Sequence, residues 1–119
     1  MTAKTLIQRL LTATAWTGIA LLSLMTIVPA AERPTTGLPH GFEHVAAFGM
    51  VGIFCGLAFR LKPLPLYGYA FLFSAALELV QIPLPSRHAR LEDFLFDTIG
   101  AWLGLALGRS IDNLATSAK

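Results

Sequence analysis

Five polar side chains lie within apolar sequence at spacings that could join them in one site. Glu78 and Gln81 are three residues apart, and Asp93 and Asp97 are four apart, so each pair shares one face of a helix. A charged side chain at the centre of a membrane helix costs about 2.5–3.5 kcal/mol, which pairing or hydration offsets. Arg87 lies between the two pairs, and its guanidinium can bind a carboxylate through two hydrogen bonds. This pattern indicates a hydrogen-bonded site that binds a polar group or supports acid–base chemistry.

A glutamate and a histidine begin another apolar segment. We assign Glu43 and His44 to the same polar site, with His44 as a hydrogen-bonding member. His40 precedes His44 by four residues, a spacing at which two histidines can share a metal-binding face. A proline and a glycine beside His40 place it in a loop, however, and the sequence offers no further histidine or cysteine ligand beyond His88. We therefore predict no metal ion and no cofactor.

A simpler interpretation stays open for each of these residues. Glu92 and Asp93 can favour a helix N-terminus through the helix dipole without any further role. The basic residues of the preceding loop can bind lipid phosphates. Glu78 and Asp97, which lie deeper in apolar sequence, can form a polar network that only fixes how the helices pack.

The composition indicates a membrane protein of one domain. The chain has 119 residues, of which 55% are hydrophobic and 13% charged, whereas soluble domains carry about 25% charged residues. The single cysteine excludes an intramolecular disulfide bond. Basic residues are scattered rather than gathered in a stripe with aromatic residues, so we expect no nucleic-acid partner.

Four apolar segments are long enough to cross a hydrocarbon core of about 30 Å as helices. We predict an all-α, membrane-embedded bundle of four transmembrane helices in a single domain over residues 1–119. The helices are expected near residues 10–30, 42–60, 64–83 and 91–109, separated by segments rich in proline and glycine. The first segment could instead be a cleaved signal peptide, but it is longer than the usual apolar region of about 7–15 residues, so we favour a retained helix.

Small residues follow one face of the last predicted helix. Gly100, Gly104 and Gly108 recur at four-residue spacing, which lets another backbone approach closely in a membrane. Asp97 lies on the same face as Gly100 and Gly104, so we expect its carboxylate to point into the bundle.

The basic residues predict the orientation in the membrane. One side carries Lys4, Arg9, Arg60, Lys62, Arg109 and Lys119, and the other carries Arg33, Arg87 and Arg90. Cytoplasmic loops are enriched in lysine and arginine, so both termini are predicted to be cytoplasmic, in the cell inner membrane. The polar side chains of three helices and one loop then converge at the level of the outer leaflet.

The motifs resemble those of VanZ-like membrane proteins. The similarity lies in Glu78-x-x-Gln81, Pro85-Ser86-Arg87, Asp93, and Asp97-x-x-Gly100-Ala101-x-x-Gly104, and more weakly in the segment from Glu43 to Phe48. Asp97 stands where the family often has asparagine, and His40-Gly41 where it often has Asp-Lys. The resemblance implies a small multi-pass membrane protein, in a family named after a member associated with low-level resistance to the glycopeptide teicoplanin.

Two functions are therefore expected, with others less favoured. The first is recognition of a membrane lipid or a lipid-linked envelope precursor, with Arg87 binding its anionic group. The second is an enzyme that uses a carboxylate and His44 as acid and base on such a lipid. A purely structural bundle or partner subunit is a further alternative. A conducting pathway is disfavoured because charged residues are missing from the predicted cytoplasmic half of the helices.

Overall fold

The computed structural model describes residues 1–28, 37–83 and 91–118, and it is all-helical over these ranges. The helices are α1 (Ala3–Ile27), α2 (His40–Ala58), α3 (Pro63–Gln81) and α4 (Leu91–Ser117). Each is long and apolar enough to cross a membrane. The predicted all-α bundle of four membrane-spanning helices is therefore confirmed.

The helix boundaries differ from the predicted ones where polar sequence continues a helix. α1 begins at Ala3, because the Thr2 side chain accepts a hydrogen bond from the Thr5 backbone N–H and caps the helix. α4 continues to Ser117, since glycine and proline are missing from the polar residues after Arg109. α2 begins at His40, so the expectation that His40 lies in a loop is wrong. The proline before it serves as the N-cap and leads directly into the helix.

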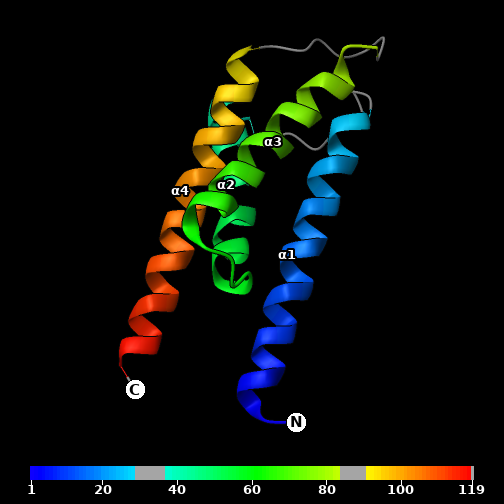
Figure 1. The fold of residues 1–119 in the computed structure, drawn as a ribbon. Helices are drawn as coiled ribbons and strands as arrows, with labels where there is room; N and C mark the ends of the chain where they lie inside the picture. The colour runs from blue at the N-terminus through cyan, green and yellow to red at the C-terminus, as the bar shows by residue number, and fades with distance from the viewer. Residues whose placement is uncertain (29–36, 84–90, 119) are drawn as a thin grey trace.

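The closest contact in the bundle is between α2 and α4, which lie side by side along most of the length of α2 (Figure 1). A side chain at Gly104 would collide with the carbonyl oxygen of Gly49, and one at Gly52 would lie 2.6 Å from the carbonyl oxygen of Ala101. The same row holds the pairs Val45–Gly100, Gly49–Gly104 and Ile53–Gly108. The partners in each pair are separated by the same number of residues, so the two helices run parallel and in a fixed register.

The other two helices complete the bundle around this pair. α1 packs against α2 and α3, and its Ala15 side chain is fully buried. At the end that carries both termini, Arg60 donates hydrogen bonds to Asp112 of α4 (2.6 Å) and to Gln8 of α1 (2.9 Å). Gln8 in turn donates to the Ala58 carbonyl at 2.6 Å. This network ties α1, α2 and α4 together at one end of the molecule.

The distribution of side chains is the reverse of that in a soluble protein. Leu72, Leu79 and Leu103 are each more than 60% exposed, whereas Glu78 and Asp97 are buried. Apolar side chains outside and polar ones inside are the arrangement that a lipid surrounding favours. Figure 1 shows the N- and C-termini at the same end of the bundle, and the starts of α2 and α4 at the opposite end.

The close approach of α2 and α4 predicts a large difference between two glycine substitutions. Gly104→Ala introduces a methyl group against the Gly49 carbonyl, and overpacking of this kind lowers the free energy of unfolding by about 1–3 kcal/mol. Gly68→Ala in α3 has open space around the new methyl group and should be neutral or stabilising by up to about 1 kcal/mol. Thermal unfolding in detergent measures both. Equal stability of the two variants would contradict the contact.

Candidate functional site

Buried polar side chains gather at the end of the bundle where α2 and α4 begin and α3 ends. Each is less than a tenth exposed: they are Glu78 and Gln81 of α3, and Asp93, Asp97 and Thr98 of α4. Glu78 and Gln81 occupy the last turn of α3, and Asp93 the first turn of α4. Burial of so many polar groups in an apolar bundle requires partners, since an unpaired polar group in lipid costs several kcal/mol.

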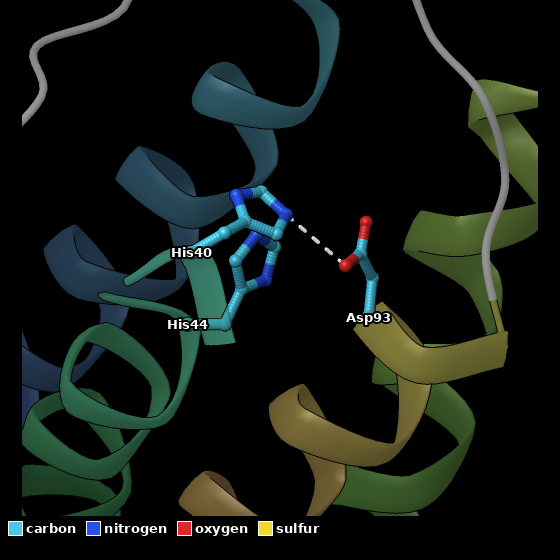
Figure 2. A group of neighbouring side chains, drawn as sticks. All are labelled: His40, His44 and Asp93. Carbon is cyan, nitrogen blue, oxygen red and sulfur yellow. Dashed lines mark hydrogen bonds and ion pairs between the residues drawn. The ribbon is translucent and has the colours of Figure 1, made fainter. Parts of the chain in front are cut away.

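Two histidines of α2 supply partners for the two aspartates of α4. His44 Nδ1 lies 2.5 Å from Asp97 Oδ1, and His40 Nε2 lies 3.1 Å from Asp93 Oδ1. Figure 2 shows the His40 and His44 rings next to each other and facing Asp93 across the gap between the helices. The His44–Asp97 pair is the more enclosed, with side-chain exposures of 16% and 3%. A carboxylate that close fixes the orientation of the imidazole ring.

The same register that brings the glycines together also aligns these pairs. The partners in the His40–Asp93 and His44–Asp97 pairs are both 53 residues apart. Next along the same two faces come Phe48 and Ala101, which belong to one buried cluster. Further along, Gly52 contacts Leu105 and Gly56 contacts Arg109, again at the same separation. The histidine–aspartate pairs are thus the polar end of one continuous row of α2–α4 contacts.

The helix N-termini add a favourable field at this end. α2 and α4 are parallel and both begin here, so their partial positive charges face the carboxylates of the first two turns. Every lysine and arginine within the described residues lies toward the other end: Lys4, Arg9, Arg60, Lys62 and Arg109. Among these residues, the basic side chains close to Asp93 and Asp97 are therefore histidines.

An apolar cavity of about 400 Å³ lies next to the polar cluster. All four helices line it, and Phe48, Phe73 and Ala101 form part of its wall. Phe48 stacks on His44 at a ring-centroid distance of 6.5 Å. Ala101 follows Asp97 by one helical turn. The cavity therefore begins one turn below the histidine–aspartate pairs and extends toward the opposite end, where Phe59 and Leu66 line it.

The remaining sequence-predicted residues lie as follows. Glu43 is half-buried in the first turn of α2. Glu43 and Glu78 each interact with another group and are not free side chains. Arg87 lies outside the described residues, so its predicted pairing with a carboxylate stays a prediction. Gly100, Gly104 and Gly108 contact α2, as the glycine spacing led us to expect for a neighbouring helix.

Three residues at this end were not predicted from the sequence as members of the site. His40 was excluded by its assignment to a loop, although its four-residue spacing from His44 was the right signal. The hydroxyls of Ser74 and Thr98 are buried, and within the described residues they have no hydrogen-bond partner. Ser74 precedes Glu78 by four residues on the same face of α3, a spacing that could have identified it.

A double-mutant cycle tests the His44–Asp97 contact. His44→Leu or Asp97→Leu alone leaves a buried polar group without its partner, which should lower the free energy of unfolding by about 1–3 kcal/mol. The double variant should lose less than the sum of the two, with a coupling of about 0.5–3 kcal/mol. Arg60 and Asp112, a more exposed pair at the other end with side-chain exposures of 57% and 19%, serve as the control cycle with a coupling of about 1 kcal/mol or less. Additive effects at His44 and Asp97 would contradict the contact.

Comparison with known proteins places this architecture in a family. A model of the VanZ/LLP1 family matches residues 4–112. This range includes the two histidine–aspartate pairs and the glycines of α2 and α4 that form the close helix contact. No curated protein and no solved structure matches the chain. The family match covers most of the 119 residues and agrees with the motifs in α3 and α4. The chain therefore belongs to the VanZ/LLP1 family of membrane proteins.

Proposed function

We propose that this protein binds a lipid of the bacterial cell envelope, with the headgroup at the polar cluster and an acyl or prenyl chain in the apolar cavity. The observation that supports this most strongly is the adjacency of the two features. Phe48 lines the cavity and stacks on His44, so polar and apolar surfaces meet within one helical turn. An amphiphilic ligand fits such a site better than a purely polar or purely apolar one. A cavity of about 400 Å³ is within the range of ligand sites.

The headgroup we propose is anionic and carries hydroxyl groups, as in phosphatidylglycerol or a lipid-linked envelope precursor. The side chains of Glu78 and Gln81 accept hydrogen bonds from hydroxyls, and hydrogen bonds to a carboxylate are stronger than those between neutral groups. The N–H of His40 and the guanidinium of Arg87 bind the phosphate. Asp93 and Asp97 orient the histidines.

We place the site on the outer side of the inner membrane, with both termini cytoplasmic and α1 retained as part of the bundle. The positions of the described lysines and arginines support this orientation, because all of them lie toward the end with the termini. The packing of Ala15 and Gly18 of α1 against the other helices supports its retention.

A second candidate is an enzyme acting on the same lipid. The observation that favours it is the His44–Asp97 pair, in which a carboxylate orients an imidazole that can act as a general base. Asp97→Asn keeps the shape of the side chain but favours the wrong tautomer of the histidine. Loss of turnover in this variant, with lipid binding retained, would favour the enzyme over the binding protein.

Filling the cavity should weaken binding of the acyl or prenyl chain of the lipid. Ala70 lines the cavity and is only partly buried, so the large side chain of Ala70→Trp can occupy the space. Native mass spectrometry of the purified protein with phosphatidylglycerol should show at least about a tenfold loss of affinity, equal to about 1.4 kcal/mol. Leu72→Trp, on the exposed face of the same helix, is the matched control and should bind like the wild type. Unchanged binding in both variants would refute the cavity as the chain site.

Neutralising a carboxylate of the headgroup site should reduce selectivity and alter the envelope phenotype. We expect Glu78→Gln to bring the affinity for phosphatidylglycerol close to that for phosphatidylcholine, because a charge-assisted hydrogen bond is lost. We propose that the same variant, and Asp97→Ala, change sensitivity to teicoplanin in a strain lacking the wild-type protein. Asp112→Asn at the opposite end of α4 is the control. Normal selectivity and normal sensitivity in inserted Glu78→Gln and Asp97→Ala proteins would refute the proposal.

A further inference from the structure

His40, His44 and Asp93 form a group whose chemistry goes beyond lipid binding. One ring nitrogen of each histidine and one oxygen of Asp93 lie within 4.8 Å of one another. Figure 2 shows the two rings on α2 turned toward the Asp93 carboxylate on α4. The ring centroids of His40 and His44 are 4.4 Å apart. The reasons for predicting no metal were a loop position for His40 and the lack of a third histidine or cysteine ligand. The helical position of His40 and the side chain of Asp93 remove both.

We propose that His40, His44 and Asp93 bind a divalent transition-metal ion of the Zn²⁺ class. Imidazole nitrogen and carboxylate oxygen are ligands that zinc accepts, whereas magnesium and calcium prefer oxygen ligands alone. Two histidines four residues apart on a helix present their rings to the same side, as in known zinc-binding helices. The third ligand comes from a different helix, so the ion would bridge α2 and α4.

The distances are close to those of a bound ion. A tetrahedral zinc ion about 2.1 Å from each ligand separates the ligand atoms by about 3.4 Å. The widest pair here is at most 4.8 Å, so the ligands need to close by no more than about 1.4 Å. His40 Nε2 and Asp93 Oδ1 already lie 3.1 Å apart, and the His40 side chain is 50% exposed and so has room to adjust.

The surroundings of the group match those of metal centres. A metal-bound histidine usually donates its other ring N–H to a carboxylate, which fixes the tautomer and the ring plane. Asp97 is in that position, because its Oδ1 lies 2.5 Å from His44 Nδ1. The contact between α2 and α4 holds the ligands in register. Three protein ligands and an exposed side at His40 leave a coordination position for water or a ligand oxygen.

Metal titration of the purified protein in detergent, with no lipid added, tests this inference separately from the lipid proposal. We expect one Zn²⁺ or Co²⁺ per chain, a visible spectrum typical of a four- or five-coordinate cobalt ion, and no competition by Mg²⁺. His40→Gln and Asp93→Asn should each weaken binding at least about tenfold, and Asp97→Asn about 10–100-fold. Since His40 is half exposed at the helix start, His40→Gln should leave the fold intact.

Glu92→Gln is the matched control for Asp93→Asn, because Glu92 is the exposed acidic neighbour on the same helical turn. It should bind cobalt like the wild type. The inference is overturned if the wild type binds no stoichiometric metal, or if His40→Gln and Asp93→Asn bind as tightly as Glu92→Gln. Failure of metal binding would leave lipid binding by the cavity untouched.

Discussion

The close backbone contact between α2 and α4 is the constraint on which the rest of the structure depends. Glycines at four-residue spacing allow the Gly49 carbonyl to meet Gly104 directly, a contact that a side chain would prevent. The contact fixes both the distance between the helices and their register. At the polar end the same register places His40 opposite Asp93 and His44 opposite Asp97. A shift of α2 against α4 by one residue would separate both pairs. The geometry of the site therefore depends on the packing of these two helices.

The sequence predicted the four helices and the inward direction of Asp97, but not which helix packs against the glycines of α4. Long apolar segments and their breakers identified the helices, and the shared face of Asp97 and Gly100 predicted that the carboxylate points inward, where it is 2% exposed. The stripe on α4 could not show which helix it faces, because several helices carry small residues. The prediction of a loop at His40 is wrong because the neighbouring proline, which often indicates a loop, is also favoured at a helix start. Arg87 lies outside the described residues, so its role stays a prediction.

Burial of carboxylates in a membrane bundle needs compensation, and for Asp93 and Asp97 the described part of the chain offers histidines and helix N-termini rather than lysine or arginine. The parallel N-termini of α2 and α4 direct partial positive charge at the first turns of both helices. The histidines then form hydrogen bonds with Asp93 and Asp97. A polar network that served only to stabilise the fold would be expected to be shielded from the surface and from any cavity. This one opens to the surface at His40 and adjoins an apolar cavity at Phe48.

These electrostatics also limit what the site can bind. The phosphate of an anionic headgroup that approaches the cluster meets Asp93 and Asp97, which repel it unless a cation lies between. Helix dipoles alone contribute about 0.3–1 kcal/mol for each exposed charge, too little to offset two carboxylates. Protonated histidine, the loop arginine or a bound metal ion can each provide that cation. A metal ion bound by His40, His44 and Asp93 would be the strongest of these, since it would neutralise a carboxylate and could accept a phosphate oxygen as a further ligand. The proposed selectivity for anionic lipids would then depend on whether a metal ion occupies the His40, His44 and Asp93 group.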